Sequence, residues 1–155
     1  MKLYIVRHGE ALPKYINPAR SLSEDGRIKI ERLATLLKPL RLSVAEIWHS
    51  GKERARQTAE ILSSAVTSQK EAKSIDGLDP DDSIDPILDK IMNLRDDLMI
   101  VGHLPFVDKL TRALLVGKQV NEILSFPTGG IACLEQSLGD DWHLLWFLNP
   151  ELLGD

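Results

Sequence analysis

The chain is poor in the features that mark disulfide-stabilised, membrane-spanning and nucleic-acid-binding proteins. It has a single cysteine, Cys133, in 155 residues, so no disulfide can form within the chain and a reducing compartment suits it. No apolar run is long enough for a membrane span, and the apolar segment 1–6 is too short for a signal peptide. A net charge of −4 lacks the basic excess typical of a general nucleic-acid binder. We therefore expect a cytoplasmic protein with neither nucleic acid nor membrane as a partner.

The rest of the composition is that of an ordinary globular protein, with 43% apolar and 27% charged residues. The length fits one domain, which we assign to residues 1–155. Segments typical of strands are 3–6, 44–48, 98–101, 131–136 and 142–147, and segments with helical patterns are 24–38, 52–64, 87–94 and 105–115. Strands that alternate with helices predict an α/β three-layer sandwich, with a mostly parallel central sheet, helices on both faces and antiparallel C-terminal strands.

Side chains suited to binding an anion follow three of these strands where each ends. Arg7 and His8 come directly after the first strand, and His103 comes just after the third. Arg54 and Arg56 follow the second strand on different faces of the predicted helix, so at most one of them can point to the same place. Taken singly, each residue is typical of a solvated turn or a helix start. Because the carboxyl ends of parallel strands meet at one edge of a sheet, the joint pattern predicts a phosphate site there.

The two remaining histidines are weaker candidates. His49 ends the second predicted strand and is a candidate for a supporting contact, whereas His143 lies within a strand and is expected to be structural or exposed. The spacing of the four histidines does not fit a zinc site, so we expect neither a metal nor another cofactor.

Three ordered motifs resemble those of the histidine phosphatase superfamily. They are Val6-Arg7-His8-Gly9-Glu10, the segment 50–59 with the sequence Ser-Gly-Lys-Glu-Arg-Ala-Arg-Gln-Thr-Ala, and Val101-Gly102-His103. In the second motif the resemblance selects Arg54 over Arg56 as the phosphate ligand. The short chain and the segments 20–23, 103–105 and 126–128 are similar to the SixA branch of protein phosphohistidine phosphatases. The resemblance thus implies a phosphoglycerate mutase-like fold.

The resemblance also implies a metal-independent mechanism. His8 would attack phosphorus and become a phosphohistidine, which water then hydrolyses. Arg7, Arg54 and a protonated His103 would bind the phosphoryl oxygens and stabilise their charge. Candidates for supporting positions around these four residues are Gly9, Arg20 and Thr128. The implied partner is a histidine-phosphorylated protein, such as a component of a phosphorelay.

The chain departs from many relatives that cleave oxygen esters, because these use a carboxylate between the second and third motifs as a general acid. The loop before the third predicted helix offers five carboxylates, none of which fits that position convincingly: Asp76, Asp79, Asp81, Asp82 and Asp85. Without an acid, a phosphorylated imidazole is the better leaving group, because free histidine has a pKa of ~6.5 and its protonated ring leaves as a neutral group.

Two alternatives stay open at this point. The chain could be a small-molecule phosphomonoesterase of the same superfamily, or a non-catalytic module that binds phosphorylated partners through the same pocket. The sequence does not determine the oligomeric state.

Overall fold

A mixed sheet forms the centre of the protein in the computed structural model, which describes residues 1–119 and 121–154. Within these residues the sheet has six strands in the order β5-β3-β6-β1-β7-β8. The strands are β1 (Lys2–Arg7), β3 (Glu46–His49), β5 (Lys73–Ser74), β6 (Leu98–Gly102), β7 (Ile131–Gln136) and β8 (Trp142–Leu148). Strands β5, β3, β6 and β1 pair in parallel, while β7 is antiparallel to both β1 and β8. The predicted mostly parallel sheet with antiparallel C-terminal strands is confirmed.

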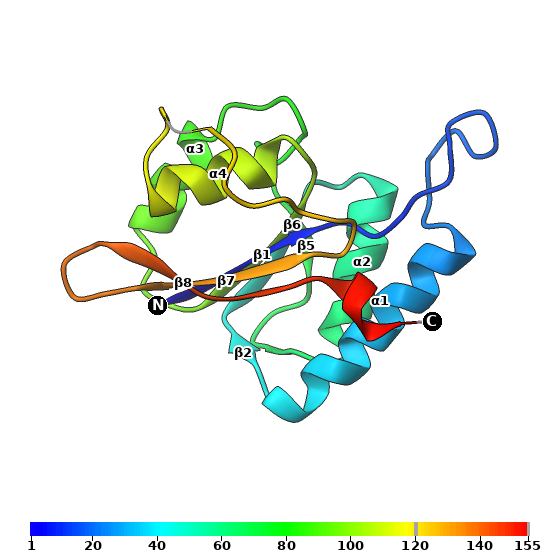
Figure 1. Cartoon of the computed structure of the whole chain (residues 1–155), viewed down its shortest axis with the longest axis horizontal. Coiled ribbons are helices and arrows are strands. Elements are labelled where there is room, and N and C mark those ends of the chain that lie inside the picture. Colours follow the sequence, from blue (N-terminus) through cyan, green and yellow to red (C-terminus); the bar gives the residue numbers. More distant parts are fainter. Residues whose placement is uncertain (120, 155) are drawn as a thin grey trace.

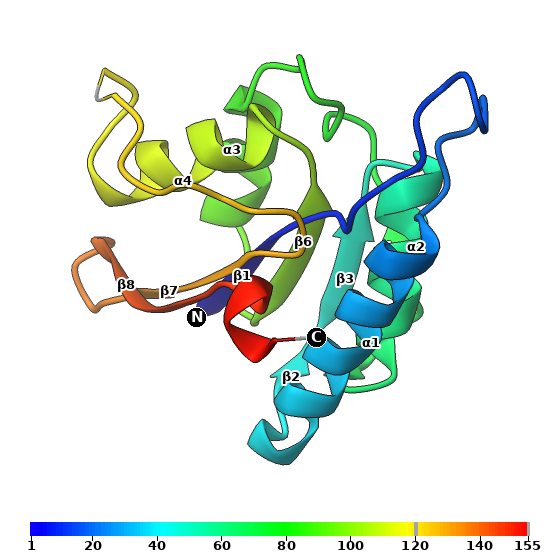
Figure 2. The same ribbon diagram turned by 45° about the vertical axis from the view of Figure 1, so that its right-hand side comes forward.

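Helices cover both faces of this sheet (Figure 1 and Figure 2). One face carries α1 (Glu24–Leu37) and α2 (Glu53–Ser63), and the other carries α3 (Asp85–Met92) and α4 (Phe106–Leu115). Short 3₁₀ turns follow α1 (Lys38–Leu40) and β8 (Pro150–Leu153). Each helical layer packs on its own apolar cluster, so the sheet is buried on both sides.

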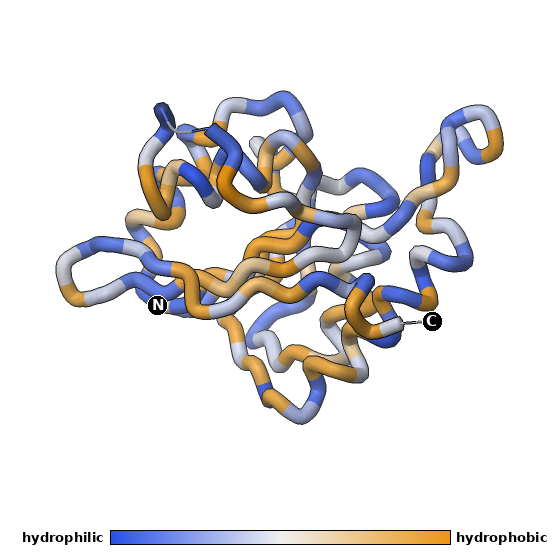
Figure 3. Tube along the Cα trace, in the orientation of Figure 1, coloured by the Kyte–Doolittle hydropathy of each residue, from blue (hydrophilic) through white to orange (hydrophobic). Residues whose placement is uncertain are grey.

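The continuous apolar run of β1 follows from this double burial. Tyr4 and Val6 belong to the cluster under α1 and α2, whereas Leu3 and Ile5 belong to the cluster under α3 and α4. Because successive side chains of a strand point to opposite faces, a strand covered on both faces needs apolar residues at every position. Figure 3 shows the same pattern as apolar central strands framed by polar loops.

The predicted start and end of the first helix are both confirmed. Ser23 caps α1, and its side chain accepts a hydrogen bond of 3.0 Å from the Gly26 amide. The helix ends at Leu37, and Pro39 lies in the 3₁₀ turn that follows. Cys133 is buried in β7, and burial raises the pKa of its thiol to about 11, as expected for an inert core thiol.

The prediction of one strand over 44–48 is wrong. The segment divides at Ala45, whose amide donates to the Asp97 carbonyl. Val44 belongs instead to β2 (Ser43–Val44), which pairs with β4 (Thr67–Ser68) in a separate ladder. The very short strands β4 and β5 were not predicted, because two residues, mostly polar, carry no readable alternation.

The strand register positions the ends of β1, β3 and β6 side by side. Arg7 is aligned with Gly102, and His49 is aligned with Val101. The residues that follow these strands therefore emerge at one edge of the sheet.

None of the helices in residues 1–119 and 121–154 is long and apolar enough to cross a bilayer.

The contact between α1 and the chain at Glu10 generates a stability prediction. A Cβ at Gly26 would lie 2.1 Å from the Glu10 carbonyl oxygen, which cannot move as a flexible side chain would. We expect Gly26→Ala to lower the free energy of unfolding by roughly 1–3 kcal/mol, although alanine is the better helix former. Denaturant unfolding measures this. The control is Gly139→Ala, where a Cβ meets no atom within 4 Å and stability should change by less than about 0.5 kcal/mol. An unchanged Gly26→Ala midpoint would contradict the argument.

Candidate active site

Two imidazoles face each other where β1 and β6 end. His8 follows β1 directly and His103 follows β6 directly, so the parallel register makes them neighbours. Their ring centroids are 5.0 Å apart and the rings are tilted by 51°. Both residues are buried, His8 with 8% of its surface exposed and His103 with 1%. The predicted convergence of these two histidines is thus present in the structure.

The tautomer of His8 follows from its hydrogen bond to the backbone. Its Nδ1 lies 2.6 Å from the Gly9 carbonyl oxygen. Because a carbonyl can only accept, Nδ1 carries the proton, and Nε2 keeps its lone pair. The backbone amide of His8 donates to the Gly102 carbonyl at 2.9 Å, which ties the residue to the end of β6. The result is a neutral imidazole with a basic nitrogen held in one orientation.

Burial keeps His8 neutral over most of the pH range. It lowers the pKa of His8 to about 4, the hydrogen bond to the Gly9 carbonyl opposes this, and the charges of Arg54 and Arg7 add to the lowering. The pKa of His103 is lowered to about 3, again mainly by burial and then by His8 and Arg54. Burial and the neighbouring positive charges thus favour a neutral His103 in the free site, and its expected protonation beside a bound phosphoryl group stays a prediction.

Arg7 is held by the loop that precedes β7. Its Nη1 donates to the Phe126 carbonyl at 2.8 Å, and its backbone amide donates to Gly130 at 3.0 Å. In return the Gly129 amide lies 3.0 Å from the carbonyl oxygens of both Arg7 and His8. The segment 126–130 thus clasps the end of β1 from the side opposite β6. Burial lowers the pKa of the Arg7 guanidinium.

Arg54 and Arg56 lie on different faces of α2, as the helical spacing requires. Arg54 is in the first turn, near enough to lower the pKa of both imidazoles, and the helix dipole there favours anions. Arg56 instead binds two carboxylates of its own helix: its Nε donates to Glu53 at 3.1 Å and its Nη1 to Glu60 at 2.5 Å. The structure therefore places Arg54, not Arg56, at the candidate site.

Three buried nitrogens in this cluster lack a hydrogen-bond partner among the described residues: Arg7 Nε, Arg54 Nε and His103 Nδ1. Buried polar atoms are usually satisfied, and unsatisfied ones mark places where a ligand completes the bonding. Two guanidinium groups and an imidazole around a free Nε2 are suited to a phosphoryl group, whose oxygens accept several hydrogen bonds.

Sequence reasoning missed Ser50 and Thr58. Ser50 Oγ and His103 Nε2 share a hydrogen bond of 2.6 Å, which orients the second imidazole. Thr58 Oγ1 accepts from the Gly9 amide at 3.0 Å and donates to the Arg54 carbonyl at 2.7 Å. The signals were available: Ser50 directly follows β3, and Thr58 lies one helical turn after Arg54.

The three candidates for supporting positions have different surroundings. Gly9 contacts His8 and Thr58 through its backbone, and a Cβ there would meet Ile30 at 2.8 Å. Arg20 has a left-handed backbone (φ 51°), and its charge lowers the pKa of both imidazoles. Thr128 belongs to the clasping segment 126–130, but its side chain has no hydrogen-bond partner among the residues the structure covers.

His49 does not join the two facing imidazoles. Its Nδ1 accepts from the Gly51 amide at 3.0 Å, which braces the turn that carries Ser50. Burial lowers the pKa of His49, and so does the charge of Arg56.

Burial lowers the pKa of the Arg54 guanidinium and the charge of Arg20 lowers it further, whereas Asp79, in the acidic loop before α3, opposes this lowering. The charge of Asp79 therefore acts on Arg54 of the candidate site. The Asp79 backbone amide donates to the Asp82 carboxylate at 2.9 Å, and this hydrogen bond stabilises the conformation of the loop. Asp85 pairs with Lys118, away from the imidazoles.

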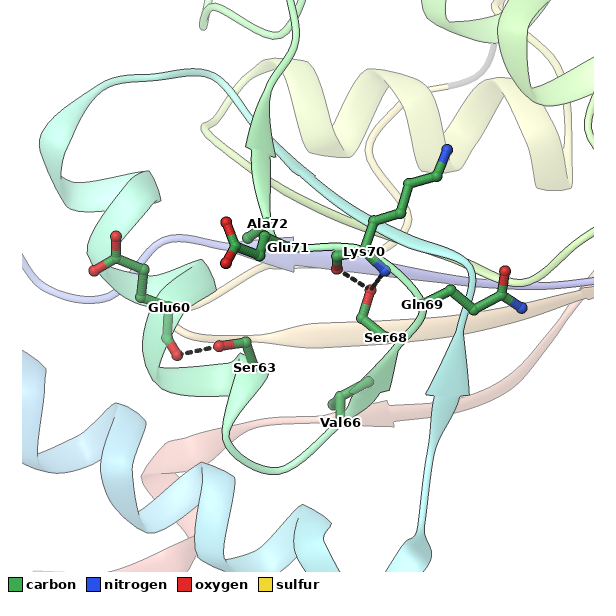
Figure 4. Close-up of a pocket in the computed structure, with 8 residues that line it drawn as sticks. All are labelled: Glu60, Ser63, Val66, Ser68, Gln69, Lys70, Glu71 and Ala72. Carbon is green, nitrogen blue, oxygen red and sulfur yellow. Dashed lines mark hydrogen bonds between the residues drawn. The ribbon is translucent and has the colours of Figure 1, made fainter.

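No cluster in residues 1–119 and 121–154 brings three or more His, Cys, Asp or Glu side chains together in a way that would hold a metal ion. A hollow of about 610 Å³ lies beyond the C-terminal end of α2 (Figure 4). It is lined by Glu60, Ser63, Val66, Ser68, Gln69, Lys70, Glu71 and Ala72. These residues are at the opposite end of α2 from Arg54. The Ser63 hydroxyl donates to the nearby Glu60 carbonyl, and the Ser68 hydroxyl donates to the Lys70 carbonyl and accepts from the Lys70 amide. Despite its volume, this hollow has no link to the facing imidazoles.

Residues 3–79 match the family model described as the histidine phosphatase superfamily (branch 1), a stretch that includes Arg7, His8 and Arg54. The chain is similar to the protein histidine phosphatase SixA, solved with tungstate, with a TM-score of 0.85, 22% identity and 99% of each chain covered. It is also similar to a SixA from Agrobacterium tumefaciens described as a candidate phosphohistidine phosphatase, with a TM-score of 0.75, 25% identity and coverage of 96% and 97%.

A phosphoserine phosphatase mutant from Entamoeba histolytica, solved with phosphoserine, has a TM-score of 0.74, 17% identity and 98% coverage of both chains. No curated protein sequence gives a significant match. The similar structures thus include phosphatases of proteins and of small molecules on one fold.

The neutral imidazoles predict a specific pH dependence of stability. Unfolded histidines titrate near pH ~6.5, whereas His8 and His103 stay neutral in the folded state down to about pH 4 and 3. As the pH falls below 6.5, these two histidines bind protons in the unfolded chain but not in the folded chain. The free energy of unfolding therefore falls. Each imidazole contributes up to about 1.4 kcal/mol per pH unit. Thermal unfolding between pH 7 and 5 should show a flatter slope for His8→Gln. A matched variant is His143→Gln, at a side chain that is 52% exposed, which controls for the loss of an imidazole outside the candidate site.

The two arginines of α2 offer a paired test of the anion site. We expect Arg54→Ala to weaken binding of inorganic phosphate at least about tenfold, because a charge-assisted hydrogen bond to the anion is lost. Arg56→Ala should leave the affinity nearly unchanged, since its carboxylate partners are on the outer face of the helix. Calorimetric titration measures both, with circular dichroism as the check on folding. Equal losses in the two variants would rule out this placement of the anion.

Proposed function

The chain belongs to the histidine phosphatase superfamily, and on that premise we propose that residues 1–155 act as a single metal-independent phosphatase domain whose substrate is a phosphohistidine. The observation that carries the proposal is the hydrogen bond from His8 Nδ1 to the Gly9 carbonyl at 2.6 Å. It leaves Nε2 as a free base on a ring that the charges of Arg54 and Arg7 reach, and a nucleophile toward phosphorus requires such a free lone pair. The similarity to SixA supports the choice of substrate.

In the first step His8 Nε2 attacks phosphorus in line, the new N–P bond forms, and the bond to the leaving nitrogen breaks. The His8 ring becomes cationic while Nδ1 keeps its proton, and the Gly9 carbonyl stabilises that charge. A substrate imidazole that is protonated on its other nitrogen leaves as a neutral molecule. Arg7 and Arg54 bind the phosphoryl oxygens throughout the transfer, so charge that develops there meets donors already in place.

In the second step water attacks the phosphorylated His8. The P–O bond forms, the N–P bond breaks, and the electron pair returns to Nε2, which regenerates the neutral ring and releases dihydrogen phosphate. His103 donates a hydrogen bond to the phosphoryl oxygens once the dianion is bound, because a nearby negative charge raises an imidazole pKa that burial had lowered. Ser50 keeps this ring oriented in both protonation states.

The cytoplasm is the proposed site of action, since the buried thiol of Cys133 suits a reducing compartment. The proposed substrate is a histidine-phosphorylated protein, such as a component of a phosphorelay.

Asp79 favours a second candidate function, hydrolysis of small phosphate esters. An alkoxide leaving group needs a proton, and Asp79 is the loop carboxylate whose charge reaches Arg54. If esters are substrates, Asp79→Asn should slow alkyl phosphate hydrolysis and leave phosphohistidine hydrolysis unchanged.

The direct test is hydrolysis of a histidine-phosphorylated peptide in the presence of EDTA. We expect wild-type activity to persist, and His8→Ala to reduce kcat at least about 10³-fold, because it removes the nucleophile. A denaturing quench of the wild-type reaction should trap phosphate on His8, bound as an acid-labile phosphoramidate. A phosphoserine peptide of the same sequence is the comparison substrate. Faster hydrolysis of phosphoserine than of phosphohistidine would contradict the proposal and favour the second candidate function, hydrolysis of phosphate esters.

A further inference from the structure

A basic cleft of about 370 Å³ borders the candidate active site at the N-terminal end of α2. Its cationic lining consists of Lys14, Arg20, Lys52 and Arg54, of which Arg54 also belongs to the site. The charges of Arg20 and Lys52 reach the site as well, because both lower the pKa of His103. The volume corresponds to on the order of ten water molecules, more than a phosphate group alone would fill.

The charge of this cleft is not neutralised from within the protein. Its one lining carboxylate, Glu53, is bound by Arg56 on the outer face of α2. None of the four cations forms an ion pair with a carboxylate among the described residues, and Asp79 acts on Arg54 only from a distance. By contrast, Lys70 and Lys73 both pair with Glu46, and the whole chain carries a net charge of −4. A concentrated positive field in an acidic protein is suited to an anionic partner.

A projecting loop, residues 11–22, forms one wall of the cleft and extends beyond the body of the protein (Figure 1 and Figure 2). Its two ends are joined by a β-bridge between Ala11 and Leu22 and by the hydrogen bond from the Leu12 amide to Ser21 at 2.8 Å. At its tip Tyr15 is 89% exposed and Ile16 is 61% exposed. Adjacent apolar and aromatic side chains held out in solvent beside a charged wall are typical of a protein-contacting surface.

We propose that the basic cleft and the projecting loop receive an acidic segment of the phosphorylated protein, and so set which phosphoproteins the site accepts. Carboxylates next to the phosphorylated residue pair with Lys14 and Lys52, while Tyr15 and Ile16 pack against the surface that carries them. The proposal rests on the proposed function, and it adds the chemistry of the substrate around the phosphoryl group. Charge complementarity carries it, since the four cations have no carboxylate partner of their own.

The test compares two phosphohistidine peptides that differ only in their flanking residues, glutamate in one and glutamine in the other. We expect the wild type to prefer the acidic peptide in kcat/KM by roughly three- to tenfold at low salt, and to lose the preference at high salt. Lys14→Glu should abolish the preference and leave hydrolysis of p-nitrophenyl phosphate unchanged. The matched charge reversal, Lys38→Glu at the far end of α1, should keep the preference.

Binding to the His8→Ala protein separates this proposal from the proposed function. If the wild type hydrolyses neither peptide, the proposed function fails, but His8→Ala should still bind the acidic peptide more tightly, and Lys14→Glu should remove that difference. Equal binding of the two peptides, or a preference that survives Lys14→Glu, would overturn the inference even if phosphohistidine hydrolysis is established. Tyr15→Ser should raise KM for a whole acidic phosphoprotein without changing hydrolysis of p-nitrophenyl phosphate. An unchanged KM would show that the loop tip does not contact the substrate protein.

Discussion

The parallel register of β1 with β6 and of β6 with β3 is the constraint on which the candidate site depends. It aligns Arg7 with Gly102 and His49 with Val101, so the residues that follow the three strands emerge together. The two facing imidazoles and the serine that orients His103 are then neighbours without any further adjustment. A shift of one residue in any of these pairings would turn one of the groups to the opposite face of the sheet.

Electrostatics then determines the state of the site. Burial lowers the pKa of both histidines, and the charges of Arg54 and Arg20 add to this at each ring, so the positive charge of the free site lies on its arginines. A phosphoryl dianion reverses this balance when it binds, because it offsets the charges that had kept the imidazoles from taking up protons. The same groups can therefore present a free base before the reaction and additional hydrogen-bond donors during it.

The sequence predicted the layers of the fold and the four residues that meet at its edge, because both follow from strong local signals. Apolar runs marked β1 and β6; Arg7 is the last residue of β1, and His8 and His103 directly follow β1 and β6. What it missed depends on contacts between distant segments. The division of 44–48 follows from the hydrogen bond of the Ala45 amide to the Asp97 carbonyl, and the lowered pKa of His103 follows from burial beside His8, neither of which a linear pattern contains. The chemical roles of the assembled residues stay predictions.

The clasp of Arg7 by the segment 126–130 has a consequence for how the protein is made. The Arg7 side chain and the Phe126 carbonyl that it binds are 119 positions apart. A ribosome that adds ~5–20 residues per second needs roughly 6–24 s to cover that distance. Helices α1 and α2 and strand β6 are synthesised within this interval, but β7 (Ile131–Gln136) is not, so the edge of β1 that pairs with β7 stays open throughout it. The contacts that hold Arg7 at the candidate site can therefore form only when the last fifth of the chain is synthesised.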